Sequence, residues 1–154
     1  MNTTIDIQNY LPHRAPLLMV DLITNLDTNF VETTFLIKED NIFVDKTTFI
    51  EAGLIENTAQ TCSSIVGQKY FIDSEGEINE NAKVLGFISA LKNVKIHALP
   101  KVGDTITTQS TLVSKFVGDD YTLCTMNCQS TLEEKILLEC EINLFIQKTI
   151  STVE

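Results

Sequence analysis

The apolar residues of this chain recur with two different periods, and the period changes along the sequence. From Leu17 to Leu26 and from Phe30 to Ile37, apolar and β-branched residues dominate, with the turn-forming residues 27–29 between them. Runs of this kind bounded by turn residues are typical of β-strands. We therefore expect an N-terminal hairpin. A short helical turn over Ile5 to Tyr10 should precede it and end before Pro12.

Residues Ile50 to Tyr70 follow helical spacing instead. Apolar and small side chains recur there at steps of three and four residues, at Ala52, Ile55, Ala59, Cys62 and Val66. No charged residue lies between Glu56 and Lys69, so most of this helix should be buried. A long buried helix in a chain of this size needs a sheet that wraps it.

Strand-like segments return after an acidic, turn-rich stretch from Asp73 to Asn81, which we expect to form an exposed loop. Short separators suited to tight reversals divide these segments from one another. They run over Lys83 to His97, Thr105 to Val117, Tyr121 to Leu132 and Lys135 to Gln147. The predicted order is therefore a hairpin, a buried helix and a four-stranded meander, within a single domain over residues 1–154.

The composition narrows the classes of function. With 154 residues, 44% hydrophobic and 21% charged, the chain should fold around one core. A formal charge of -10 disfavours nucleic acid as a partner. No apolar run approaches the roughly twenty residues of a membrane span, and the polar start does not resemble a signal peptide, so we expect a cytoplasmic protein. The four cysteines lack paired spacing, and we expect buried thiols with no metal or cofactor.

Three motifs carry a family resemblance that covers nearly the whole chain. The run 11–16 (Leu-Pro-His-Arg-Ala-Pro), followed by an apolar segment ending at Asp21, resembles the N-terminal signature of 3-hydroxyacyl-(acyl carrier protein) dehydratases. Glu56 and Gln60 are similar to the glutamate and glutamine found four residues apart in the central helix of those enzymes. The stretch 99–105, with its proline and glycine-aspartate turn, is similar to the turn before a long strand in many hot-dog proteins.

This resemblance implies an α+β hot-dog fold, in which a curved antiparallel sheet wraps one long helix. It also implies that Glu56 matches the catalytic acid of the family. The usual catalytic histidine of these enzymes lies in a Gly-His-Phe-Pro-Gly loop before the helix, whereas residues 40–49 here contain no histidine. The chain thus resembles a divergent branch of dehydratases, some of them tied to aryl-polyene or related pigment pathways.

Dehydration of a 3-hydroxyacyl thioester requires a base, an acid and donors that hold the enolate-like oxygen. Glu56 suits the acid, because a carboxyl group on a dry helix keeps its proton near neutral pH. Together with Gln60, Ser63 and Gly67 it forms a helical stripe that could border an acyl tunnel and bind substrate. Alternatively, Glu56 faces solvent or pairs with a basic residue of a second subunit.

The base and the oxygen donors are less defined by sequence. His13 and His97 are the two histidines of the chain. His97 is expected at a surface or strand edge, and His13 has either a catalytic or a structural role. Water, Asp45 or a residue of a partner subunit are alternatives for the base. Backbone N–H groups near Gly53 and Leu54 could bind the thioester oxygen, although the glycine could equally make room for a strand.

The expected partner is an acyl carrier protein that presents the thioester, and the expected assembly is a homodimer or a larger homo-oligomer of dimers. Carrier proteins are acidic, so a local basic patch is expected near the tunnel mouth. Its candidates are Arg14, Lys46, Lys92, Lys95 and Lys101. Two alternatives stay open: a non-catalytic acyl-binding protein or partner subunit of an active dehydratase, and an acyl thioesterase.

Overall fold

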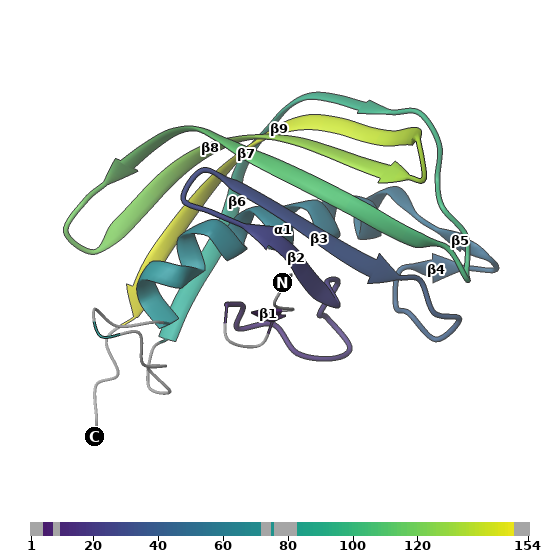
Figure 1. Ribbon diagram of the computed structural model, residues 1–154, viewed down its shortest axis with the longest axis horizontal. Coiled ribbons are helices and arrows are strands. Elements are labelled where there is room, and N and C mark those ends of the chain that lie inside the picture. Colours follow the sequence, from purple (N-terminus) through teal and green to yellow (C-terminus); the bar gives the residue numbers. More distant parts are fainter. Residues whose placement is uncertain (1–4, 8–9, 72–74, 76–82, 150–154) are drawn as a thin grey trace.

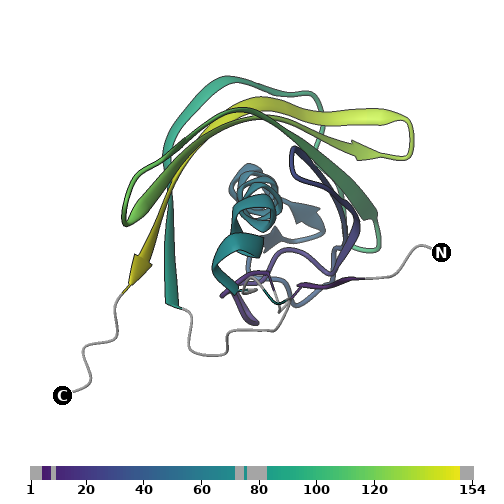
Figure 2. The same ribbon diagram turned by 60° about the vertical axis from the view of Figure 1, so that its left-hand side comes forward.

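One curved antiparallel sheet wraps a single long helix in the computed structural model, which describes residues 5–7, 10–71, 75 and 83–149 (Figure 1). The helix, α1 (Glu51–Phe71), lies in the hollow of the sheet (Figure 2). The seven strands have the order β1-β2-β3-β7-β8-β9-β6. Their bounds are β1 Ile5–Asp6, β2 Leu22–Leu26, β3 Phe30–Leu36, β6 Lys83–Ile96, β7 Thr105–Val117, β8 Tyr121–Leu132 and β9 Lys135–Thr149. The predicted α+β architecture and long helix are confirmed. The predicted four-stranded meander is correct only for β7, β8 and β9, because β6 pairs with β9 at the edge of the sheet and does not lie next to β7.

The core lies between α1 and the concave face of the sheet, where alternate strand residues point inward. On β8, the predicted core pattern is confirmed, since Cys124, Met126 and Cys128 are all buried. All four cysteines are free and buried. A hydrogen bond with Cys128, together with burial, raises the pKa of the Cys140 thiol, which therefore stays protonated. These cysteines thus belong to the packing of the core.

The side of α1 that faces the sheet is unusually polar. Asn57, Thr58 and Thr61 are fully buried, and each is hydrogen-bonded. Thr108 Oγ1 donates to Asn57 Oδ1 over 2.7 Å, and the hydroxyls of Thr33 and Thr61 are 2.7 Å apart. Buried polar groups are stable only when paired in this way.

The part of the chain that the structure describes contains no helix with the length and apolar character of a membrane span.

The segment before β2 departs from the prediction. We expected one strand from Leu17 to Leu26, but β2 begins only at Leu22. Side chains of α1 bind the preceding backbone: Gln60 Oε1 accepts from the Met19 N–H over 2.7 Å, and Asn57 Nδ2 donates to the Met19 carbonyl over 2.7 Å. Met19 therefore finds its backbone partners on the helix, which explains why an apolar segment is not a strand here.

Two further local features differ from the prediction. The helical turn expected over Ile5 to Tyr10 is found only in part. Ile5–Asp6 forms β1, which pairs with β2 through Ile5 and Ile23, whereas the N–H groups of Tyr10 and Leu11 donate to the Ile7 carbonyl. A small hairpin of β4 (Val44–Asp45) and β5 (Thr48–Phe49) precedes α1 and was not expected. The predicted loop 73–81 lies outside the described residues except for Glu75.

Asn57→Leu tests the buried polar network. The substitution keeps a similar side-chain size but leaves the Met19 carbonyl without the amide donor and removes the acceptor of the Thr108 hydroxyl. Because each buried unsatisfied group costs about 1–3 kcal/mol, the free energy of unfolding in urea should fall by about 2–4 kcal/mol. The exposed Asn127→Leu is the matched control and should change it by less than about 0.5 kcal/mol. Equal stability of the two variants would contradict the role of the network.

Candidate active site

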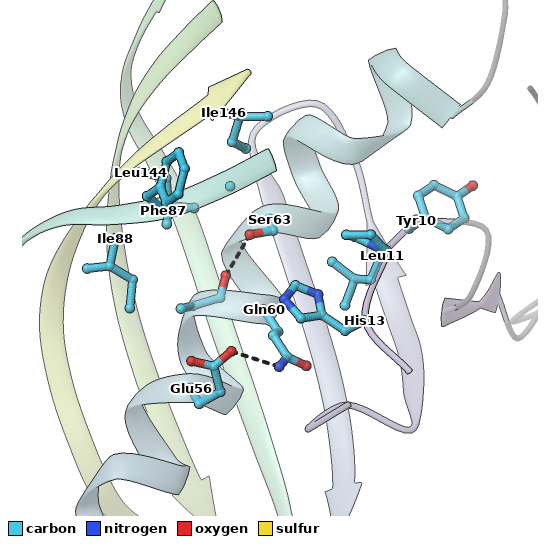
Figure 3. Close-up of a pocket in the computed structure, with 13 residues that line it drawn as sticks. Tyr10, Leu11, His13, Glu56, Gln60, Ser63, Phe87, Ile88, Leu144 and Ile146 are labelled. Atoms are coloured by element: carbon cyan, nitrogen blue, oxygen red, sulfur yellow. Dashed lines mark hydrogen bonds between the residues drawn. The ribbon is translucent and has the colours of Figure 1, made fainter. Parts of the chain in front are cut away.

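A pocket of about 330 Å³ opens between the N-terminal segment, one face of α1 and the strands β6 and β9 (Figure 3). Its polar side chains come from the N-terminal segment and the helix, and its apolar side chains come mainly from the two strands. The lining residues are Tyr10, Leu11, Pro12, His13, Glu56, Ala59, Gln60, Ser63, Gly86, Phe87, Ile88, Leu144 and Ile146. The pocket thus combines ionisable groups with an apolar wall, as sites for small amphipathic ligands do.

The helix side of the pocket carries the stripe that the sequence predicted. Glu56, Gln60 and Ser63 are spaced by four and three residues, and all three line the pocket. Glu56 is half-buried, so its carboxyl group is in contact with the pocket without being enclosed by protein. The surroundings of Gly67, the fourth member of the stripe, lie outside what the structure describes.

Gln60 joins Glu56 to the N-terminal segment. Its Nε2 donates to Glu56 Oε1 and to the Leu17 carbonyl, each over 2.9 Å, while its Oε1 accepts from the Met19 N–H. Gln60 is almost completely buried, at 1% exposure, so its amide is held by protein groups on both sides. The structure therefore gives Gln60 a positioning role toward Glu56, and its expected contact with substrate stays a prediction.

His13 brings the second ionisable group to the same pocket (Figure 3). Its Nδ1 is buried and has no hydrogen-bond partner among the described residues. Burial lowers the pKa of His13, an effect that the nearby Glu56 carboxylate opposes and the Arg14 guanidinium reinforces. Near neutral pH the imidazole is therefore uncharged, and one buried ring nitrogen is not engaged by protein.

Arg14 holds the turn on which His13 lies. Its Nη1 donates to the carbonyls of Leu11 and His13, both over 2.8 Å. These bonds fold the guanidinium back over the backbone of the Leu-Pro-His-Arg-Ala-Pro run at residues 11–16. The motif thus supplies both the histidine and the charged group that fixes its position.

The apolar wall was missed by sequence reasoning. Ile88, Leu144 and Ile146 reach the pocket from β6 and β9, and Gly86 lies opposite Ile146 in the antiparallel register of these strands. Only this long-range register places residue 86 beside residue 146. A local pattern that marks a strand does not carry that information.

Gly53 and Leu54 do not line the pocket. A Cβ atom on Gly53 would lie 2.6 Å from Phe43 Cβ and 2.7 Å from the Phe49 ring, so the glycine makes room for aromatic side chains. The N–H groups of Gly53 and Leu54 both donate to the Ile50 carbonyl. In this conformation neither donor is directed to a ligand, and their expected role in binding the thioester stays a prediction.

His97 is separate from the pocket. It is exposed at a strand end, as predicted, and its Nε2 lies 3.0 Å from Glu139 Oε2. Among the described residues, no group of three or more His, Cys, Asp or Glu side chains is arranged to hold a metal ion. Of the lining residues that the structure describes, three have ionisable side chains: Tyr10, His13 and Glu56.

Solved structures with a similar fold include a chain of a dehydratase heterocomplex and a hypothetical thioesterase. One chain of the dehydratase heterocomplex ApeI:P from Xenorhabdus doucetiae superposes with a TM-score of 0.71 at 17% identity, over 96% of this chain and 93% of that chain. The HP0420 homologue from Helicobacter felis gives 0.62 at 10% identity, over 89% and 97%. A hypothetical thioesterase with coenzyme A from Streptococcus pneumoniae TIGR4 gives 0.56 at 14%, over 84% and 87%. At these identities the likeness establishes the hot-dog fold.

Family membership rests on sequence. No curated protein matches the chain significantly. The family model described as ApeP dehydratase, however, matches residues 5–153, nearly the full length. The divergent dehydratase relationship inferred from the N-terminal run and from Glu56 is thereby confirmed. The chain belongs to the ApeP-like dehydratase family.

Proposed function

We propose that this protein removes water from 3-hydroxyacyl thioesters, with His13 as the base and Glu56 as the general acid. The observation that carries the proposal is that both side chains line one pocket, where burial lowers the pKa of His13 and leaves its imidazole uncharged near neutral pH. The proposed cycle begins with a neutral imidazole, which accepts a proton, and with a protonated carboxyl group, which donates one. In these states the two groups match the two proton transfers of a dehydration.

The reaction needs both groups in turn. His13 takes the proton from the carbon next to the thioester carbonyl, and the electron pair left behind forms the new carbon–carbon double bond. The bond from the next carbon to its hydroxyl breaks as Glu56 gives that oxygen a proton, so that water leaves. Transfer of a proton from His13 to Glu56 then restores both groups. The Gln60 amide keeps the carboxyl group oriented toward the pocket throughout.

An acyl carrier protein is the partner that we propose to present the substrate. Of the basic residues expected near the tunnel mouth, Lys92 and Lys95 lie opposite Glu141 and Glu139 across the β6–β9 pairing. Opposite charges at such positions reduce the net charge of that surface. Arg14, adjacent in sequence to the pocket residue His13, is the cation best placed to attract an acidic carrier protein.

We also propose that the chain forms a homodimer through β6. This strand lies at the edge of the sheet and exposes apolar side chains on both faces, among them Phe87, Ile88, Leu91 and Val94. An exposed, apolar edge strand pairs readily with another strand. Because β6 also forms one wall of the pocket, a second copy paired at this edge would cover the site.

The alternatives use the same pocket. A thioesterase would use Glu56 or His13 to activate water for attack on the thioester carbonyl. The similar fold of the hypothetical thioesterase from Streptococcus is the reason to test this reaction. A partner subunit would be inactive alone and would act only within a complex with a second chain. The similar Xenorhabdus chain belongs to such a heterocomplex. Assay products separate the three: an enoyl thioester, a free acid with a free thiol, or no turnover without an added dehydratase subunit.

Glu56→Gln tests the proposed acid. The amide keeps the size of the side chain but has no acidic proton, so the rate of enoyl thioester formation should fall at least about a hundredfold. Absorbance of the enoyl product measures it. Glu51→Gln, at an exposed position in the first turn of the same helix, should leave the rate within about twofold. An unchanged rate in Glu56→Gln would remove Glu56 from the mechanism.

The pH profile tests the proposed base. Because burial lowers the pKa of His13, the imidazole stays neutral below the ordinary value of 6.5 and becomes protonated only at lower pH. The acid-side fall in kcat/KM should therefore have its midpoint below pH 6.5. His13→Gln should lower kcat/KM by about 10²–10⁴-fold and abolish this limb. A limb that persists unchanged in the variant would assign it to another group.

The mass of the protein in solution, with variants on the edge strand β6, tests the proposed homodimer. The chain of 17.2 kDa should elute in light-scattering chromatography at twice that mass. The double variant Leu91→Lys with Val94→Lys adds charge to the apolar edge and should be a monomer. Leu36→Lys, at a similarly exposed position on the interior strand β3, should stay dimeric. A monomeric parent protein, or a dimeric double variant, would contradict pairing through β6.

A further inference from the structure

Gly86 differs from the other glycines whose surroundings the structure describes. Gly103 has a φ of +93°, which a side chain tolerates poorly. A Cβ atom on Gly53 or on Gly118 would lie only 2.6 Å from the nearest side-chain atom. Each of these three positions thus has a conformational or steric reason to be glycine.

Gly86 has neither reason. It lies within β6 without a positive φ, and a Cβ atom there would meet only Ile146 Cγ1, at an ordinary contact distance of 3.8 Å. Glycine inside a strand weakens the strand, and it often marks a place where a ligand approaches the backbone closely. The position therefore points to a requirement for open space beside the strand.

That open space belongs to the pocket. Gly86 lines the pocket and pairs with Ile146, whose side chain is buried and also lines the pocket. Residues directly opposite on antiparallel strands point to the same face of the sheet. Any side chain at position 86 would therefore extend beside Ile146 into the pocket.

Gly86 also lies at the end of the pocket away from the proposed acid. In Figure 3, Ile146 lies beyond Ser63, and Glu56 lies at the other end of the helix stripe. From residue 56 to residue 63 a helix advances by about 10 Å. A thioester that reacts at Glu56 would therefore direct its hydrocarbon chain along Ser63 toward Gly86 and Ile146.

We propose that Gly86 sets the length of acyl chain that the pocket accepts, an inference that rests on the proposed function and specifies its substrate. The bare backbone at this position leaves room for the distal methylenes of the chain. A larger residue would occupy that room and shorten the accepted chain, while the groups around Glu56 and His13 stay unchanged. Gly86 is thus a specificity-determining residue for the acyl chain.

Binding of a chain-length series tests the proposal without requiring turnover. The probes are S-alkyl thioether analogues of N-acetylcysteamine thioesters with four to twelve carbons, measured by isothermal titration. In the parent protein, affinity should rise about fourfold for each added methylene until the pocket is full, since a buried methylene contributes about 0.8 kcal/mol. In Gly86→Leu the rise should stop about three methylenes earlier. The longest accepted chain should then bind roughly 50-fold more weakly, with the shortest unchanged.

Two variants on the same strand serve as controls. Gly86→Ala should shorten the accepted chain by about one methylene, because the added methyl group fits without strain. Ser89→Val adds bulk at a residue of β6 that does not line the pocket and should leave the whole series unchanged. Circular dichroism and chromatography establish that each variant keeps the parent fold and assembly.

The outcomes separate this inference from the proposed function. If the parent protein binds the series and Gly86→Leu shows the same length limit, the role of Gly86 is wrong while the acyl pocket stands. An equal loss at every length in Gly86→Leu would also overturn it. If the parent protein binds no member of the series, the pocket does not hold acyl chains, and the proposed function fails with it.

Discussion

The pocket depends on the hydrogen bonds by which two amide side chains of α1 hold the backbone of Met19. Asn57 binds its carbonyl, and Gln60 binds its N–H. These bonds take the place of strand pairing for a segment that does not enter the sheet. They place the backbone leading from His13 to β2 across the helix, so that the imidazole and the Glu56 carboxyl group line the same pocket.

The same network fixes the rotation of the helix. A helix with a uniformly apolar face can turn or slide in an apolar groove at little cost, whereas paired buried polar groups specify one arrangement. Thr108 binds Asn57, and the hydroxyls of Thr33 and Thr61 bind each other. With that side of α1 held by β3 and β7, the stripe that carries Glu56 is directed away from those strands and into the pocket. Rotation would leave several of these groups buried and unpaired, which is costly.

Sequence reasoning predicted the elements whose period is strong and local. The spacing within 50–70 predicted α1 almost to the residue, and the turn residues predicted the strands β6, β7, β8 and β9 but not the pairing of β6 with β9. Sequence reasoning misplaced the segment from Leu17 to Asp21. The backbone of Leu17 and of Met19 binds the Gln60 side chain, which lies more than forty positions away in the sequence. The stripe through Glu56 and Gln60 could be predicted from helical spacing. The approach of His13 and the apolar wall at Ile146 could not, since both follow from long-range contacts.

The wall and the proposed chemistry lie on different parts of the fold. Glu56 and Gln60 belong to the core helix, and a substitution of Gln60 would also remove the bonds to Leu17 and Met19. Gly86 lies on the edge strand, where an added Cβ would meet only one neighbouring atom within 4 Å. A change at the edge therefore alters the space available to a ligand at small structural cost, while a change on the helix alters the arrangement of the ionisable groups. In this fold, selection of the acyl chain is thus physically separable from the proton transfers that we propose.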